Sequence, residues 1–277
     1  MLNADLHCHS NCSDGVLTPA EVARYAYDGG VQLWSLTDHD ELSGQHAAHQ
    51  AATALGMQYV YGVEISVTWA ERTVHVVGLN FNPACEALVN GLAEARRGRV
   101  ARAQAMAAQL AKVGIEDAYA GALRYASNPD LIARTHFARY LVEAGFAPSL
   151  PAVFKRYLTE GHPGFVAHCW AQLADAVSWI NAAGGVAVLA HPGRYRYTPR
   201  EFEILFTTFK ELGGKALEVI TGSHTKQQYQ EYAQIVRHYG FWASRGSDFH
   251  APKESRTALG SLPALPADLT PVWHLWL

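Results

Sequence analysis

Short apolar runs alternate with helical patterns in the first part of the chain and again in its last part. Runs of four to eight residues rich in Val, Ile, Leu and Tyr are typical of strands, and apolar residues three and four apart are typical of helices. The predicted strands are Ala4–His9, Leu33–Thr37, Gln58–Val67, Thr73–Asn80, Gly185–Ala190, Ala216–Ile220 and Phe241–Ser247. The predicted helices are Thr18–Gly29, Ser43–Leu55, Ala174–Ala183, Thr198–Leu212 and Lys226–Tyr239. This alternation predicts an α/β architecture with a mainly parallel sheet, in which a turn around Ala70–Arg72 joins two of the strands.

A long central stretch, residues 83–164, interrupts the alternation, because it contains helical patterns and no convincing strand. One apolar face recurs at helical spacing in Val100, Ala103, Met106, Ala107 and Leu110. Further helices are predicted at Ala133–Ala144 and Pro151–Leu158. We therefore predict that residues 1–82 and 165–277 form two portions of a barrel, and that residues 83–164 form an α-helical insertion that binds substrate.

Composition and charge narrow the class of protein. With 277 residues, 49% of them hydrophobic and 17% charged, the chain can bury a sizeable core and is typical of globular proteins. The formal net charge of −3 gives no bulk attraction to long duplex nucleic acid or acidic membranes, so any anion site must be local. No apolar run approaches the ~20 residues that cross a bilayer, and the N-terminus lacks the features of a signal peptide. We expect a cytoplasmic protein with no membrane partner and with free cysteine thiols.

Histidine is the anomaly of the composition, since the chain has 14 histidines and 3 methionines. Many of these histidines, together with carboxylates, lie where predicted strands end. The candidates are His7, His9, Asp14, Asp38, His39, Asp40, Glu64, His75, His191, Asp248 and His250. In a β/α barrel the carboxyl ends of the strands converge on one face, so residues far apart in the sequence become neighbours. Because histidines are the commonest metal ligands, the pattern predicts a site for several metal ions there.

Each candidate also has a simpler interpretation. A single histidine at a strand end is more often a hydrogen-bonded polar residue than a ligand, and Asp40 could be the N-cap of the following helix. His7 and His9 are two apart on a predicted strand, so one face would have to bury both imidazoles with partners. Glu64 lies in the apolar run Tyr59–Ile65, where a carboxylate without a cation is costly to bury. Because such features coincide at several strand ends, we favour the metal site.

A set of short motifs, taken in order, resembles those of the polymerase-and-histidinol-phosphatase (PHP) family. The motifs are Asp5-Leu6-His7-Cys8-His9-Ser10, Ser13-Asp14-Gly15, Thr37-Asp38-His39-Asp40, Gly62-Val63-Glu64-Ile65-Ser66, Thr73-Val74-His75-Val76-Val77-Gly78, Ala190-His191-Pro192-Gly193 and Gly246-Ser247-Asp248-Phe249-His250. The resemblance implies a distorted seven-stranded β/α barrel, the PHP fold, and three divalent metal ions. Manganese is the ion most expected, with iron or zinc as alternatives.

The resemblance also implies how the ligands are shared. One ion would take His7, His9, Glu64 and Asp248. A second would share Glu64 and take His75 and His191. A third would take Asp14, His39 and His250.

Ligands of this kind suit phosphoester hydrolysis. Mixed imidazole and carboxylate ligands favour Mn, Fe or Zn over Ca or Mg. Closely spaced ions bind phosphoryl oxygens and supply a metal-bound hydroxide as nucleophile, so no Ser or Cys nucleophile is required. Asp38 and Asp40 are expected to hold the imidazole rings in position rather than to bind metal. The sequence therefore predicts a metal-dependent phosphatase or phosphodiesterase.

Basic residues in and near the insertion are candidates for binding a second phosphate. Four arginines are predicted to share one helix, namely Arg96, Arg97, Arg99 and Arg102. Guanidinium groups bind phosphate with two hydrogen bonds, although exposed arginines on an Ala-rich helix can equally serve solvation. The candidate substrate contacts are Arg99, Arg102, Arg134, His136, Arg194 and His224.

A helical insertion with Arg-x-His inside it resembles one branch of the PHP family. Members of this branch act as 3',5'-nucleoside bisphosphate phosphatases, and some as 5'→3' exonucleases on short RNA. The resemblance implies hydrolysis of the 3'-phosphate of a nucleotide that also carries a 5'-phosphate, pAp giving AMP and phosphate. The partner is then a nucleotide or short oligonucleotide. Two alternatives stay open: a phosphatase for another small phosphomonoester such as histidinol phosphate, and a non-catalytic nucleotide-binding PHP module.

Overall fold

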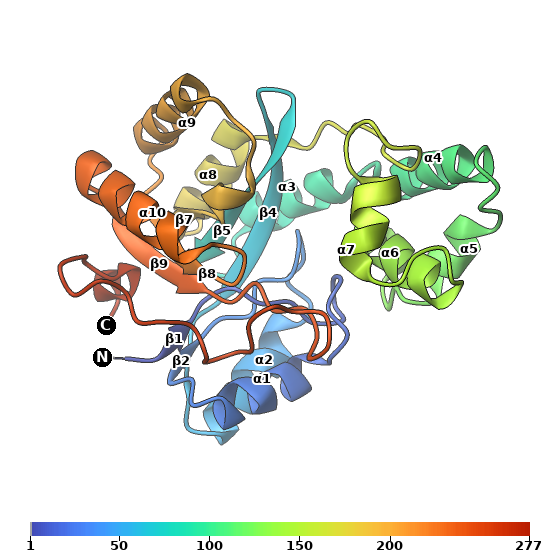
Figure 1. The fold of residues 1–277 in the computed structure, drawn as a ribbon. Coiled ribbons are helices and arrows are strands. Elements are labelled where there is room, and N and C mark those ends of the chain that lie inside the picture. The colour runs from blue at the N-terminus through green and yellow to red at the C-terminus, as the bar shows by residue number, and fades with distance from the viewer. Residues whose placement is uncertain (1) are drawn as a thin grey trace.

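The computed structural model describes residues 2–277 and contains two β-sheets with helices packed around them (Figure 1). The strands are β1 (Ala4–Asp5), β2 (Leu33–Trp34), β3 (Gln58–Tyr59), β4 (Gly62–Trp69), β5 (Arg72–Leu79), β6 (Ala171–Gln172), β7 (Val186–Leu189), β8 (Ala216–Thr221) and β9 (Trp242–Gly246). One sheet has the order β1-β2-β3 and the other the order β6-β4-β5-β7-β8-β9. Every pair is parallel except those that β5 makes with β4 and β7, so the prediction of a mainly parallel sheet is confirmed.

The helices alternate with the strands at both ends of the chain. They are α1 (Pro19–Asp28), α2 (Gln45–Ala54), α3 (Glu86–Arg96), α4 (Arg99–Ala111), α5 (Ala118–Leu123), α6 (Arg134–Glu143), α7 (Leu150–Val153), α8 (Leu173–Ala182), α9 (Pro199–Glu211) and α10 (Lys226–Tyr239). Short segments complete the set: the 3-10 turns η1 (Pro129–Leu131), η3 (Pro192–Arg194) and η4 (Val272–Leu275), and the π-helical turn η2 (Phe154–Leu158). Helix α1 begins as its sequence dictates, because Thr18 and Glu21 each accept a backbone N–H of the other.

Backbone hydrogen bonds join the two sheets at two places. Beside β9, the N–H of Leu6 donates to the carbonyl of Arg245 at 3.1 Å. On the opposite side, the segment after β2 runs along β4, where the N–H of Asp40 donates to the carbonyl of Glu64 at 2.9 Å. The α/β class is confirmed. The expected number of seven strands stays a prediction, because the ladders hold three and six strands.

Apolar side chains form separate cores in the barrel and in the insertion. The barrel core contains residues such as Ile65, Leu189 and Ile220 from β4, β7 and β8. The insertion has its own core, with Met106, Leu110, Phe137, Leu141 and Leu158 among its members. Each such buried side chain contributes roughly 1.5–3 kcal/mol to the stability of the element that carries it. We call α4–α7 with η1 and η2 the cap, which lies to one side of the barrel (Figure 1).

Helix α3 belongs to the barrel by its packing, since Leu88 and Leu92 lie in the barrel core. The division of the chain at residues 83 and 164 stays a prediction, and the packing of α3 favours a first boundary nearer Gly98.

Two predicted elements are divided in the structure. The predicted strand Gln58–Val67 is in fact β3 and β4, which lie in different sheets. The predicted helix with four arginines is interrupted at Gly98, whose φ of 85° separates α3 from α4. Glycine adopts this left-handed backbone conformation at little cost, so the residue type at position 98 explains why the helix is interrupted there. The predicted strand Ala4–His9 is also shorter, because only Ala4–Asp5 pairs regularly.

Two smaller predictions are confirmed within residues 2–277. The cysteines are free thiols. The turn between β4 and β5 is a two-residue loop with φ of 45° at Ala70 and 61° at Glu71, which matches the twist of a hairpin. None of the helices in this range combines the length and apolar character needed to cross a membrane.

Candidate metal centre

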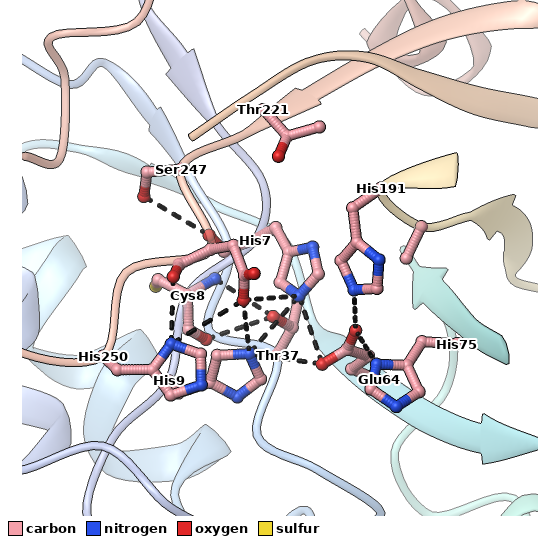
Figure 2. Close-up of polar contacts among 12 residues, drawn as sticks. His7, Cys8, His9, Thr37, Glu64, His75, His191, Thr221, Ser247 and His250 are labelled. Carbon is pink, nitrogen blue, oxygen red and sulfur yellow. Dashed lines mark hydrogen bonds and ion pairs between the residues drawn. The ribbon is translucent and has the colours of Figure 1, made fainter. Parts of the chain in front are cut away.

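Nine histidine and carboxylate side chains converge on one region of the barrel. Figure 2 labels His7, His9, Glu64, His75, His191 and His250 among them. They are His7, His9, Asp14, His39, Glu64, His75, His191, Asp248 and His250. Their donor atoms form four overlapping groups, and within each group all donor atoms lie within 4.8 Å of one another. The structure therefore brings together all nine residues predicted as ligands.

The tightest cluster combines His7, His9, Glu64 and Asp248. His7 Nε2 lies 3.3 Å from His9 Nε2 and 3.2 Å from Glu64 Oε2. His9 Nε2 lies 3.2 Å from the same Glu64 oxygen and 3.4 Å from Asp248 Oδ1. Ligands that each lie ~2.1 Å from one ion are roughly 3.0–3.4 Å apart in octahedral or tetrahedral geometry. His7 Nε2 also lies 3.7 Å from Asp248 Oδ1. The donors of His7, His9 and Asp248 therefore have close to the spacing of ligands around a single cation, and Glu64 contacts both histidines.

Glu64 links this cluster to three further histidines. Its Oε1 lies 2.7 Å from His75 Nδ1 and 2.9 Å from His191 Nε2. Its Oε2 lies 3.1 Å from His39 Nδ1. Figure 2 shows the carboxylate of Glu64 with one oxygen turned toward His75 and His191 and the other toward His7. Such a carboxylate is placed to bridge two cations.

A third cluster surrounds Asp14. Its Oδ1 lies 3.3 Å from His250 Nε2, 4.0 Å from His39 Nε2 and 3.9 Å from His9 Nδ1. His9 therefore stands between this cluster and the first. The sequence did not indicate that role, because it depends on which way the ring faces.

Several buried donor atoms of the site have no hydrogen-bond partner among the described residues. They include His9 Nδ1, Asp14 Oδ1, His39 Nδ1 and Glu64 Oε2. Burying such groups without a compensating charge is costly. Cations would satisfy these atoms, so the donor set fits divalent metal ions.

The pKa values of two histidines also fit a site for cations. Burial, followed by the nearby Arg194 charge, lowers the pKa of His191 to about 3, so its ring is neutral as a metal ligand must be. Burial also disfavours the charged form of His9, but Asp248 and Glu64 outweigh it and raise the pKa of His9 to about 10. In the absence of a cation, the carboxylates therefore hold a proton on this ring.

Three residues of the site have a left-handed backbone. Asp40, His191 and Asp248 have φ of 51°, 27° and 55°. Such conformations cost of order 1–3 kcal/mol in a residue other than glycine, and they cluster at functional sites.

Asp38 and Asp40 are buried, and among the described residues neither has an imidazole as hydrogen-bond or ion-pair partner. Asp38 accepts hydrogen bonds from the Ser10 N–H at 2.8 Å and from the Ser10 and Ser13 hydroxyls at 2.6 Å. Asp40 accepts one from the N–H of Ser66 at 2.8 Å and pairs with Arg99. Both carboxylates therefore shape the loops that carry ligands, instead of holding the rings as predicted. Asp40 is also not a helix N-cap, because Gly44 has that position in α2.

A pocket beside the nine donors is lined by arginines from the cap and the barrel. Arg99, Arg102, Arg134 and Arg194 all contribute to its wall, together with Trp170 and Phe154. Arg99 pairs with Asp40, and Arg194 pairs with Asp248 at 2.6 Å. Within residues 2–277, Arg102 and Arg134 have no carboxylate within 4.0 Å. The pocket therefore contains two guanidinium groups whose charge is not balanced by a neighbouring acid.

Two of the predicted substrate contacts do not line this pocket. His136 is fully buried at the start of α6, and its Nδ1 accepts the N–H of Ala133 at 3.0 Å. The Nε2 of His224 accepts the N–H of Gly193 at 2.9 Å. Both rings support the backbone beside the pocket, so direct contact with substrate is disfavoured for each.

Comparison with known proteins identifies the family. The sequence pattern of the PHP domain matches residues 5–241. The chain belongs to the PHP family. This PHP chain is 46% identical over 274 residues to a 3',5'-nucleoside bisphosphate phosphatase of Chromobacterium violaceum, covering 99% of the chain and 96% of that relative. It is 40% identical to a 5'-3' exoribonuclease of Haemophilus influenzae, covering 98% of the chain and 97% of that relative.

A solved structure from Chromobacterium violaceum, described as an amidohydrolase with bound sulfate and no metal, has the same fold. It superimposes on this PHP chain with a TM-score of 0.95 at 45% identity, covering 99% of the chain and 95% of its own length. The resemblance stated from the sequence motifs is therefore confirmed at the level of family and fold.

Sequence reasoning missed several residues that support the PHP site. Glu218 accepts a hydrogen bond from the His7 ring at 2.9 Å and one from the His191 N–H at 2.7 Å. Trp170 packs under Arg99 and Arg102, whose guanidinium carbons lie 4.5 and 5.3 Å from its ring centroid. Glu218 had a visible signal, because it is a carboxylate in an apolar strand, as Glu64 is. Trp170 had no local signal.

Proposed function

We propose that this PHP chain hydrolyses the 3'-phosphate of 3',5'-nucleoside bisphosphates, and that it also degrades short RNA from the 5' end. The observation that carries the proposal is the pair Arg102 and Arg134, beside the nine metal-type donors. Both guanidinium groups are partly buried, and neither has an acidic partner among residues 2–277. A substrate with two phosphates can place one at the donors and the other at the arginines.

The arginine pair has the properties of an anion site. Burial, followed by the nearby charges of Arg134 and Arg99, lowers the pKa of Arg102 to about 9. Burial, followed by Arg194 and Arg99, lowers the pKa of Arg134 to about 10. Both groups stay charged near neutral pH, and both are destabilised by burial and by one another. A bound phosphate would relieve that cost with charge-assisted hydrogen bonds.

The nine donors are proposed to hold three divalent ions, of which manganese suits the mixed ligands best and iron or zinc are alternatives. We propose the grouping His7, His9, Glu64 and Asp248 for one ion, Glu64, His75 and His191 for another, and Asp14, His39 and His250 for the third. When bound, such ions polarise a phosphoryl oxygen and activate water for attack on phosphorus.

The chain's own side chains would orient the substrate. Glu218 holds the ring of His7 so that its Nε2 faces the other donors. Arg194, paired with Asp248 and half exposed at the pocket wall, is placed to contact the phosphate that is hydrolysed. Arg102 and Arg134 would hold the second phosphate at a separate place on the wall.

The relatives support a nucleotide as the substrate class. One is named for 3',5'-nucleoside bisphosphates and another for 5'-3' exoribonuclease activity. The two reactions share a nucleotide with a terminal 5'-phosphate and a phosphoester at its 3' position. One binding mode, with the 5'-phosphate at the arginines, accounts for both.

The test is a comparison of substrates with Mn²⁺ present. We expect pAp to be cleaved to AMP, with histidinol phosphate and an aryl phosphate cleaved far less efficiently. Arg134→Ala should raise KM for pAp by about 10- to 100-fold, since a hydrogen bond to a charged group contributes ~1.5–3 kcal/mol. Hydrolysis of the aryl phosphate should change little.

Arg97→Ala is the matched control, because Arg97 is exposed and pairs with Glu94 on the same helix end. Equal losses on pAp and aryl phosphate in Arg134→Ala would contradict the role proposed for Arg134. Preference for histidinol phosphate over pAp would favour the alternative of a small-phosphomonoester phosphatase.

A further inference from the structure

The first turns of α6 contact two of the loops that carry the metal-type donors. Arg134 lines the pocket, and its neighbour Thr135 reaches the loop after β1. One turn later, Arg139 reaches the segment that follows β9. A single cap helix therefore touches both the proposed phosphate site and the cluster around Asp14.

Thr135 acts directly on a candidate ligand. Its hydroxyl donates a hydrogen bond to Asp14 Oδ2 at 2.8 Å. The other oxygen, Oδ1, then faces His250 Nε2 at 3.3 Å and has no hydrogen-bond partner among the described residues. Asp14 is almost fully buried, so solvent contributes little to its orientation. The hydroxyl from the cap selects which oxygen is presented to the cluster.

Arg139 holds the opposite side of the same cluster. Its Nε and Nη2 donate to the carboxylate of Glu254 at 2.9 Å and 2.7 Å, a bidentate pair. The neighbouring Ser255 hydroxyl accepts the N–H of His250 at 2.7 Å. Because Arg139 is buried, the pair ties α6 firmly to the short segment that positions His250.

We infer that the cap completes the cation site of Asp14, His39 and His250, with Thr135 as a positioning residue and the Arg139–Glu254 pair as its support. The inference rests on the proposed metal centre. It also predicts that this cation and an anion at Arg134 bind cooperatively, because both depend on the position of the same helix turn. Coupling of this kind is reciprocal, so each ligand strengthens the other by the same factor.

The experiment titrates Mn²⁺ into the 277-residue protein after its metal has been removed. The electron paramagnetic resonance signal of unbound Mn²⁺ gives the number of ions bound and their dissociation constants. In Thr135→Val, which keeps the shape and removes the hydroxyl, we expect the dissociation constant of the weakest site to rise about 10-fold or more. Thr135→Ser should restore it. Glu254→Gln is a second variant outside the cap and should weaken the same site. Glu143→Gln, at the exposed end of the same helix, is the matched control and should bind as the unmodified protein does.

The coupling is tested with AMP, which carries the 5'-phosphate and no phosphate to be hydrolysed. AMP should tighten the weakest Mn²⁺ site of the unmodified protein several-fold, and this gain should be lost in Thr135→Val. Unchanged Mn²⁺ binding in both Thr135→Val and Glu254→Gln would overturn the inference, as would a Thr135→Ser variant that behaves like Thr135→Val. Failure of the unmodified protein to bind Mn²⁺ would instead refute the proposed metal centre.

Discussion

At the scale of single residues, Glu218 shows how one buried carboxylate can hold two histidines that follow different strands. Its two oxygens accept the His7 ring N–H and the His191 backbone N–H. An amide in its place has only one acceptor oxygen, so Glu218→Gln would leave one of these buried donors unsatisfied. We expect a 10- to 100-fold loss of metal affinity, the usual effect of removing such a partner. Metal titration of Glu218→Gln beside Glu231→Gln, an exposed change on α10, checks this; equal affinities would disprove it.

His136 gives a prediction about pH. Burial, only partly offset by Asp14, lowers its pKa to about 4 from the 6.5 expected when unfolded. The unfolded chain therefore binds the extra proton first, and stability from this residue is present above pH 6.5 and lost as pH falls toward 4. The loss would be ~3 kcal/mol at most across that window.

His136→Gln separates this effect from other acid-sensitive groups. A glutamine at this position can still accept the Ala133 N–H, as in a capping box, and does not titrate. Between pH 7 and pH 5, urea unfolding should show a larger loss of stability for the unmodified protein than for the variant. Parallel losses would show that His136 is not the acid-sensitive group.

At the scale of elements, Gly98 decides how the arginines are presented. It separates α3 from α4 with φ of 85°, and an added Cβ would lie 2.8 Å from His168 Cε1. Gly98→Ala should cost ~1–2 kcal/mol for the left-handed backbone and displace Arg99 and Arg102, which follow it. We expect a higher KM for pAp with little change for an aryl phosphate.

Gly114 supplies the matched control for this change. Its φ is 81°, and an added Cβ would meet nothing within 4 Å. Gly114→Ala should therefore carry the same backbone cost without any effect on KM. If both variants raised KM equally, general destabilisation would explain the result and the role of the α3–α4 break would be rejected.

At the scale of the whole molecule, the donor set places the carboxylates of Asp14, Glu64 and Asp248 in one region. Removal of the metal ions should therefore lower the stability of the folded protein. Burial opposes a charge on His9, but Asp248 and Glu64 raise its pKa to about 10. In the metal-free protein, this raised pKa stabilises the fold fully below pH 6.5, and that stabilisation declines as pH rises toward 10. The decline is about 1.4 kcal/mol per pH unit at most.

Cations replace that proton, so the loaded protein should not show the decline. We expect the difference in Tm between Mn²⁺-loaded and chelator-treated protein to widen from pH 6.5 to pH 8.5. Thermal unfolding at the two pH values measures it. A constant difference would mean that His9 carries no proton in the metal-free state.

Much of the fold and of the centre could be read from local patterns. The strand–helix alternation depends on neighbours along the chain, so β7, β8, α9 and α10 were predicted close to their observed bounds. The donors were also among the candidates identifiable from the sequence, because they follow or interrupt predicted strands, but the choice of these nine came from the resemblance to the PHP family. Glu64 is the clearest case, being a fully buried carboxylate in the middle of a Val- and Ile-rich strand.

Other features depend on contacts between segments that are distant in the sequence. Glu218 meets His7 across 211 positions, and Thr135 meets Asp14 across 121. The partner of a polar side chain depends on how the layers of the fold pack together. Periodicity along the sequence does not predict that partner. For the same reason, His136 resembled a substrate contact in the sequence and proved to be a buried support of its own helix. Local order thus follows from the chain's own periodicity, while the choice of partners follows from closure of the barrel and docking of the cap.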